Sequence, residues 1–358
     1  MKGGYFVKVA VGCFVGLLVV IAGCCIQIGC GIPLAKYEKT VRLTEPLSAG
    51  AGLAAETRDG SITVTGADVT DCNVTATIIA RAGSKADAER LAGETKIKLE
   101  HPADKMAVKI ERPATICNQS VTVNLDITVP RQTSLELTAG DGAVRVTNIA
   151  GDLKAKTSDG SIAVEQIDGN TNLQTSDGGI VCRNIKSDKL YLHTSDGSIK
   201  ITEAFVKDGE AHTSDGSIAC DKMQGDSLNL KTSDGSVNVS ESTCKGLKIL
   251  TGDGSIKCEE ISAECLNCRA SDGSVFVRYA KAVPNILDVA ISTSDGNISF
   301  TGPEGLSAIV DASTNDGSIN TELPITVTGK IGKTLKGTIG KGEGKLYLKT
   351  GDGSITIK

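Results

Sequence analysis

The chain has 358 residues with 41 glycines, five phenylalanines, five tyrosines and no tryptophan. Its net charge is −5 at pH 7 and its pI is about 5.4, which argues against the basic surface that a nucleic-acid-binding protein needs. The scarcity of aromatic residues also disfavours a globular enzyme with an aromatic-lined pocket and favours thin, regularly packed β structure.

Residues 1–35 are predicted to direct the chain out of the cytoplasm. Two lysines precede an apolar run over residues 9–32, and a short basic region followed by apolar and small residues is typical of an export signal. The run Ile-Ala-Gly-Cys ending at Cys24 resembles the lipobox of bacterial lipoproteins and makes Cys24 the candidate lipidation site. An uncleaved transmembrane anchor is the alternative. The 24 residues from 9 to 32 are mostly apolar, and about 20 apolar residues are enough to span a bilayer.

Residues 36–130 are expected to form a linker and an N-terminal cap. One repeat-like turn, at Asp59, lies within this segment, and Ser84 with Asp87 resembles the start of a helix over residues 85–93. Strand-like runs are expected at 73–81, 106–112 and 120–130. A β-plus-helix segment of this kind would cover the open sheet edge of the first repeat.

From residue 131 to residue 358 the chain repeats the motif Thr-Ser-Asp-Gly-Ser-Ile. Its central copies follow one another every 18 or 19 residues, which is the signature of a solenoid. We expect a turn at each Asp-Gly pair, because glycine accepts positive φ and the Asp side chain can bond the backbone two residues on. The predicted turn residues are Asp159, Gly160, Asp177, Gly178, Asp196, Gly197, Asp215, Gly216, Asp234, Gly235, Asp253, Gly254, Asp272 and Gly273.

Within one repeat, we number positions from the turn Asp as zero. Positions −6, −4, +3 and +5 are almost always apolar, as in Leu190, Leu192, Ile199 and Ile201, and the residues between them are mostly polar. This alternation predicts strands with one buried face. We therefore expect an all-β fold, a parallel β-solenoid of 18–19-residue coils with two strands and two turns per coil. Like strands would stack about 4.8 Å apart.

The repeat carries a family resemblance. The run Leu153–Ile162, its copies, the closing run Lys345–Ile355 and the run Asp126–Pro130 are similar to the bacterial DUF4097 family, a "putative adhesin" group of β-strand repeats. The similarity extends over about residues 40–358. It implies the solenoid fold and an envelope location, and the family has no catalytic motif that would assign site residues here.

The column of turn aspartates invites comparison with calcium-binding repeats. Those need a Gly-Gly-x-Gly-x-Asp motif or several oxygen ligands converging on one ion, and neither is present. A polysaccharide-cleaving enzyme would need two carboxylates on opposite sides of a cleft. The turns of this repeat are too short to form the walls of such a cleft. His193 and His212 both occupy position −3, so their rings should lie about 5 Å apart on the outer face, as surface residues. We expect no catalytic residue, metal or cofactor.

Apart from Cys24, seven of the twelve cysteines fall into two groups. Cys182, Cys220 and Cys258 share the inward position +5 in alternate coils, too far apart to form a bridge, and should pack as small apolar residues.

Two disulfides are conceivable in an exported chain. Cys72 and Cys117 each begin a strand of the cap, and a bridge would form if those strands are neighbours. Cys244 and Cys265 are 21 residues apart and so nearly one coil apart.

These observations predict an exported, membrane-anchored repeat protein with a structural or adhesive role at the bacterial cell envelope. Its partners would be the membrane, through the N-terminal anchor, and an envelope protein or polysaccharide, with self-association also open. The alternative is a surface domain that senses envelope stress or a ligand with a membrane partner. A β-helix enzyme acting on polysaccharide is the third and least favoured hypothesis.

Overall fold

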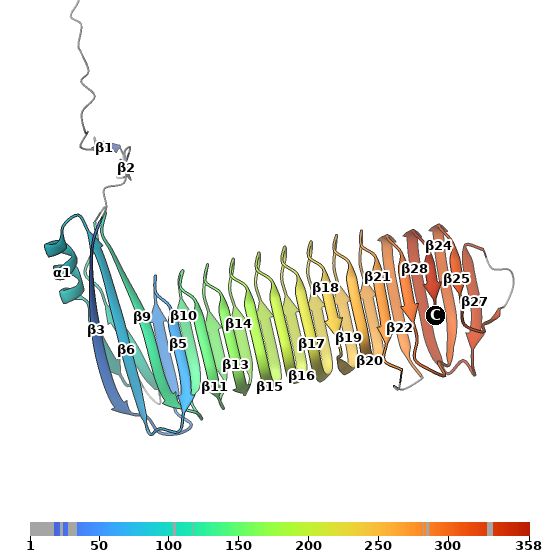
Figure 1. Ribbon diagram of the computed structural model, residues 1–358, viewed down its shortest axis with the longest axis horizontal. Helices are drawn as coiled ribbons and strands as arrows, with labels where there is room; N and C mark the ends of the chain where they lie inside the picture. The colour runs from blue at the N-terminus through green and yellow to red at the C-terminus, as the bar shows by residue number, and fades with distance from the viewer. Residues whose placement is uncertain are drawn as a thin grey trace, which may run out of the picture.

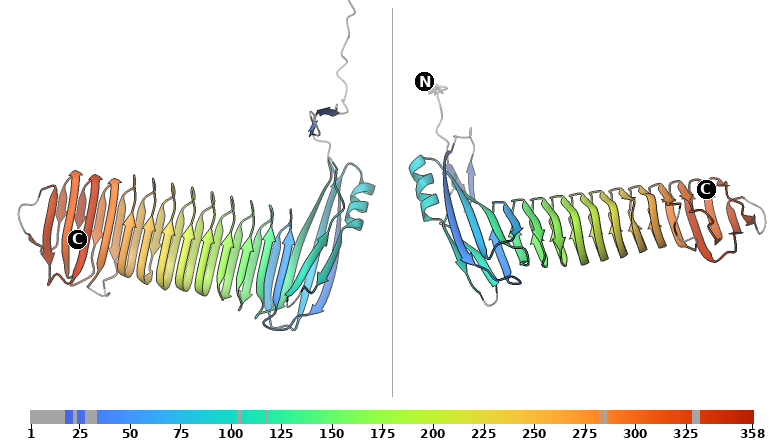
Figure 2. Two further views of the ribbon diagram at one scale, coloured as in Figure 1. Left: turned by 180° about the vertical axis from the view of Figure 1, so that it is seen from behind. Right: turned by 60° about the horizontal axis from the view of Figure 1, so that its bottom comes forward.

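The computed structural model describes residues 18–21, 24–27, 34–102, 105–116, 118–281, 283, 286–327 and 332–358. A row of stacked coils extends from a wider cap that carries the helix α1 (Lys85–Glu94) (Figure 1). Two further directions of view show the same row (Figure 2). The predicted all-β solenoid with a β-plus-helix cap is confirmed.

The stack consists of strands that pair in parallel from coil to coil. Its strands are β4 (Gly52–Thr57), β5 (Ile62–Ala67), β10 (Ser134–Ala139), β11 (Val144–Ile149), β12 (Leu153–Lys156), β13 (Ile162–Asp168), β14 (Thr171–Gln174), β15 (Ile180–His193), β16 (Ile199–His212), β17 (Ile218–Lys231), β18 (Val237–Ser240), β19 (Thr243–Leu250), β20 (Ile256–Arg269), β21 (Val275–Tyr279), β22 (Asp288–Asp295) and β23 (Ile298–Thr301). Two more short strands, β1 (Leu18–Ile21) and β2 (Cys24–Gln27), pair with each other.

The inward positions are the predicted ones. Leu190, Leu192, Ile199 and Ile201 are each at most 2% exposed, and Ile199 stands in register with its equivalents in both neighbouring coils. Burial of such aliphatic side chains contributes roughly 1.5–3 kcal/mol each. Because the side chains of one coil are covered by those of the next, this stabilisation exists only in the stack.

Each coil has a third inward run that the repeat pattern did not predict. In β16, Ala204 and Val206 at +8 and +10 are buried, and the residue before them, Glu203, has a φ of +56°. A left-handed residue breaks the alternation of the strand and turns the chain toward the core again. The same corner recurs at +7 in seven coils, at Asn148, Gln166, Asn184, Glu203, Lys222, Glu241 and Glu260. Each of these seven coils thus has three inward runs, although none of them contains more than the two strands expected.

The turn glycines are required for a different reason from the predicted one. None of the seven, Gly160 to Gly273, has a positive φ. A Cβ on Gly197 would lie 2.0 Å from the carbonyl oxygen of Gly178 in the preceding turn, and the other six glycines meet their preceding turns in the same way. The predicted bond from the Asp side chain to the backbone is also absent from these turns. Close stacking of one turn on another is what demands glycine here.

The N-terminal cap extends the stack beyond its first coil. It contains β3 (Ala35–Pro46), β6 (Asp71–Ala82), α1, β7 (Lys96–Glu100), β8 (Lys105–Glu111) and β9 (Ser120–Pro130). The coil β4–β5 lies between β8–β9 on one side and β10–β11 on the other, all paired in parallel. Residues 52–67 thus belong to the stack, although the sequence division placed them in the cap. Ser84 caps the N-terminus of helix α1, and its hydroxyl accepts from the Asp87 backbone N–H as predicted.

At the other end, the order of coils in space differs from their order in the sequence. The strands there are β24 (Ala308–Asp316), β25 (Ile319–Thr321), β26 (Thr326–Val327), β27 (Thr334–Ile339), β28 (Gly344–Asp352) and β29 (Ile355–Ile357). Strand β28 pairs in parallel with both β22 and β24, and β29 pairs with β23 and β25. The last coil of the chain is therefore inserted one place inside the end of the stack, and β27 pairs antiparallel with the outer side of β24.

Candidate binding face

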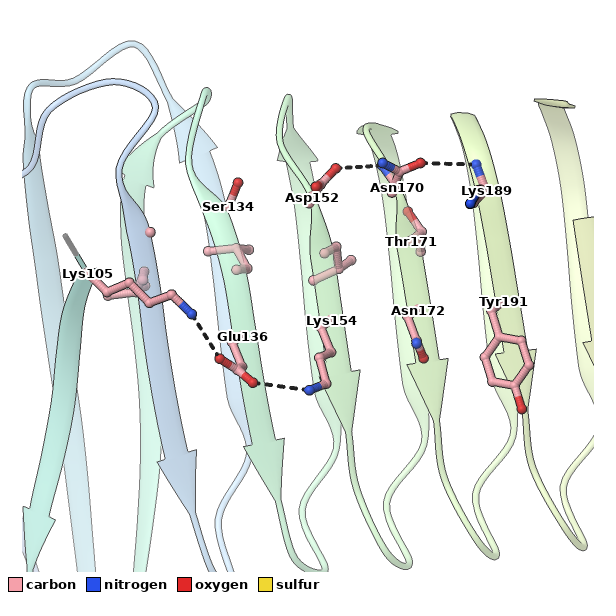
Figure 3. A pocket seen from close by; sticks show the side chains of 14 residues that line it. Lys105, Ser134, Glu136, Asp152, Lys154, Asn170, Thr171, Asn172, Lys189 and Tyr191 are labelled. Carbon is pink, nitrogen blue, oxygen red and sulfur yellow. Dashed lines mark hydrogen bonds and ion pairs between the residues drawn. The ribbon is translucent and has the colours of Figure 1, made fainter. Parts of the chain in front are cut away.

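The strand segments from position −7 to −3 form one sheet of the solenoid, and we call its outward side the groove face. Three adjoining hollows of about 560, 330 and 460 Å³ lie on it. The first and second share Lys189 and Tyr191, and the second and third share Ser227 and Asn229. Together they make a groove that crosses the strands from β4 to β22. The first hollow and its labelled side chains are seen in Figure 3.

The charges at the cap end of the groove are paired with one another. The carboxylate of Glu136 on β10 accepts from Lys105 on β8 and from Lys154 on β12, each at 3.2 Å (Figure 3). These two hydrogen bonds lower the pKa of Glu136, so that it stays ionised. The groove therefore offers no unbalanced row of basic groups at this end.

One wall of the groove is fixed by bonds between neighbouring coils. The carboxylate of Asp152 accepts from the backbone N–H of Asn170 at 2.9 Å, and the Asn170 side-chain oxygen accepts from the backbone N–H of Lys189 at 3.1 Å (Figure 3). All three residues occupy position −7 of successive coils. The side chains of Asp152 and Asn170 are held in place before any ligand arrives, which lowers the cost of binding.

The centre of the groove face carries the two predicted histidines and one tyrosine. His193 and His212 lie in register on β15 and β16 with ring centroids 5.5 Å apart, which confirms their expected juxtaposition. Tyr191 on the same strand as His193 has its ring nearly parallel to that histidine, at 19° and 6.4 Å between centroids. Burial, with Lys231 and His193 nearby, lowers the pKa of His212, which favours the neutral form of that imidazole.

The cysteines at +5 are buried, as predicted for core residues. Cys182, Cys220 and Cys258 are at most 1% exposed and free. Burial raises the pKa of Cys220 to about 12, which keeps it a neutral, unreactive thiol.

The two predicted disulfides differ in how much of each the structure describes. Strands β6 and β9 are neighbours but antiparallel, and the first residue of β9 lies opposite Arg81 at the far end of β6 from Cys72. Cys72 is a free, buried thiol, while Cys117 lies outside the described residues. Cys244 stands opposite Ala263 and points inward, whereas Cys265 stands opposite Gly246 and is exposed.

The remaining candidate residues from the sequence are the turn aspartates and Cys24, and the described residues do not bring them together into a site. The seven turn aspartates are exposed, and no group of three or more potential metal ligands occurs in the part of the chain that the structure describes. Cys24 begins β2, and nothing is described of its side chain. Among the described residues, no helix is both long enough and apolar enough to cross a membrane.

Sequence reasoning missed the groove and Tyr191. Position −5 points outward, and its residues differ from coil to coil, as in Glu136, Lys154, Asn172, Tyr191 and Glu210. The repeat pattern predicts only which way they point. The one available signal was an aromatic side chain at a position where the two neighbouring coils carry the polar residues Asn172 and Glu210.

Comparison with solved structures found distant likenesses. One is a "putative cell adhesion protein" from Clostridium sporogenes, with 13% identity over 89% of this chain and 99% of that chain and a TM-score of 0.23. A second is a "putative adhesin" from Bacteroides fragilis, with 13% identity, 89% and 97% coverage and a TM-score of 0.26. A third is a "putative lipid binding protein" from Parabacteroides distasonis, with 14% identity, 89% and 96% coverage and a TM-score of 0.32.

A search of curated proteins found no match. The model of one protein family, described as Toastrack DUF4097, matches residues 53–221 and again residues 186–358. The two matches overlap and together span the stack from its coil β4–β5 to the end of the chain. The chain belongs to the DUF4097 (Toastrack) family.

Proposed function

We propose that this chain is an exported, membrane-anchored solenoid with a structural or adhesive role at the bacterial cell envelope. We further propose that its groove face holds an extended polymer of the envelope. The observation that carries the proposal is the groove itself, which crosses the strands from β4 to β22. A ligand bound along it would meet a new set of side chains in every coil, about 4.8 Å apart.

The placement of the chain's N-terminal segment supports a tethered role. Among the strands that the structure describes, β3, which begins at Ala35, pairs with β6 alone and forms the outer edge of the capped end (Figure 1). A chain anchored through residues 1–35 would hold the stack by this end, and the groove would lead away from the membrane. This arrangement suits a spacer or adhesive arm.

The proposed location of the chain, outside the cytoplasm and attached to the membrane, can be tested by surface labelling of intact cells. We expect the full chain to be labelled by a membrane-impermeant amine reagent and to fractionate with membranes. If Cys24 is lipidated, the variant Cys24→Ala should no longer incorporate a fatty-acid analogue. If the segment is an uncleaved anchor, the variant should still be labelled at the surface and should still fractionate with membranes. Recovery of unlabelled chain in the cytosolic fraction would overturn the proposal.

A further inference from the structure

We propose that the part of the groove face around Tyr191 is a subsite for an uncharged pyranose ring of an extended glycan. This inference rests on the proposed function, because it names the polymer that the groove would hold. The subsite consists of Tyr191 and His193 on β15, Glu210 on β16 and Asn229 on β17. Three of these four residues line the central hollow of the groove.

Tyr191 and His193 form a flat platform. They are two residues apart on one strand, so both side chains lie on the same face, and their rings are nearly parallel with centroids 6.4 Å apart. The separation matches the spacing along a strand, so the rings lie side by side. The Tyr191 ring is seen face-on together with the strands around it (Figure 3), as expected of a ring lying over the sheet. A pyranose ring presents a flat C–H face that packs on such an aromatic surface.

Polar groups with unused hydrogen-bonding capacity lie beside this platform. Glu210 stands in register with Tyr191, and Asn229 stands in register with Glu210, so these three side chains follow one another along the groove at strand spacing. In the described part of the chain, the Asn229 side-chain oxygen and His193 Nδ1 are covered yet have no hydrogen-bond partner. Sugar hydroxyls both donate and accept, and can satisfy carboxylate, amide and imidazole groups together.

The geometry favours a glycan over a peptide. Peptides usually join a sheet by pairing with the free backbone groups of an edge strand. Here the strand carrying Tyr191 is interior to the sheet, paired through Asn172 on one side and Glu210 on the other. A ligand must therefore be recognised by side chains.

The charge of the groove favours an uncharged glycan over a polyanion. The lysines at the cap end, Lys105 and Lys154, are already paired with Glu136. Next to the platform, Lys189 faces Asp208 in the neighbouring coil, and Glu210 adds a further negative charge. A polyanion would find no continuous basic track there.

Calorimetric titration of the full chain with cellohexaose tests the inference, in a detergent without a sugar headgroup such as an amine oxide. We expect Tyr191→Ala to weaken binding about tenfold or more, as truncation of an aromatic anchor does, and Tyr191→Phe to retain it. The matched control is Tyr347→Ala, because Tyr347 also stands at position −5 and is 42% exposed, but lies on β28 outside the subsite. Circular dichroism would establish that each variant is folded.

Four results would overturn the inference. One is equal weakening by Tyr191→Ala and Tyr347→Ala, another is no effect of Tyr191→Ala, and the third is binding of polygalacturonate in preference to cellohexaose. Absence of any binding to cellohexaose also rejects it. None of these results bears on surface labelling of intact cells, so failure of the subsite is distinguishable from failure of the proposed envelope role.

Discussion

The hydroxyl oxygen of Thr194 lies 2.9 Å from the carbonyl oxygen of Gly178, in the turn one coil earlier, and accepts the backbone N–H of Gly197 in its own turn at 3.2 Å. Thr194 is fully buried. Thr213, Thr232 and Thr251 repeat both contacts in the coils that follow. A column of hydroxyl groups thus joins each turn to the turn before it.

Removing one of these hydroxyls should destabilise the stack. Thr194→Val keeps the shape of the side chain but leaves the Gly197 N–H without its acceptor in a buried position, which costs roughly 1–3 kcal/mol. Thr194→Ser retains the hydroxyl and should cost clearly less. Urea denaturation of the two variants makes the comparison, and equal midpoints would show that the hydroxyl column contributes nothing.

Two adjacent glycines should respond differently to a methyl group. A Cβ on Gly178 would lie 2.0 Å from the Gly160 carbonyl oxygen, whereas the nearest atom to a Cβ on Gly179 is 3.2 Å away. Gly178→Ala should therefore cost roughly 1–3 kcal/mol or more by overpacking. Gly179→Ser should be tolerated, because serine occupies this position in other coils, as at Ser198. Similar melting temperatures for the two variants would contradict the stacking argument.

The thiols of the described cysteines should differ in reactivity. Cys265 is exposed and should be alkylated in the folded chain, whereas Cys182 and Cys220 are fully enclosed and should react only after unfolding. Because burial raises the pKa of Cys220 from 9.0 to about 12, its contribution to stability is complete below pH 9 and is lost as the pH rises toward 12. Mass-spectrometric mapping after alkylation checks this order, and early labelling of Cys220 would show that the coil register is wrong.

Replacing Cys182, Cys220 and Cys258 together by valine should preserve the fold. Swaps of similar volume in a core usually cost less than about 1.5 kcal/mol per site. Loss of cooperative thermal unfolding in the triple variant would mean that these thiols do more than fill space.

The sequence was sufficient to predict the stack because its determinants recur in every coil. Ile199 and Leu190 are apolar at fixed distances from a turn Asp, and repetition makes their inward direction readable. The corner at Glu203 could not be predicted, because Asn, Gln, Glu and Lys all occupy that position and none of them requires positive φ. The position of β28 between β22 and β24 could not be predicted either, because all coils carry nearly the same pairing pattern.

The candidate site was less predictable because it depends on what differs between coils. Tyr191 and Asn229 stand at an outward position where the core imposes no residue type. Their neighbours come from other coils, so the groove becomes apparent only when the coils are stacked. The pair Cys244 and Cys265 shows the same limit, because a spacing of nearly one coil does not fix which residues stand opposite each other; in the stack they stand opposite Ala263 and Gly246.

The central claim is that the groove face, and no other side of the stack, holds an envelope polymer. Asn229 and Asn238 flank one turn and point outward from two different sheets, so Asn229→Arg and Asn238→Arg are matched obstructions. The measurement is co-sedimentation of the full chain with insoluble cell-wall material from the bacterium that produces it. We expect the wild-type chain and Asn238→Arg to sediment alike and Asn229→Arg to remain largely in solution. Equal sedimentation of the two variants would contradict the claim.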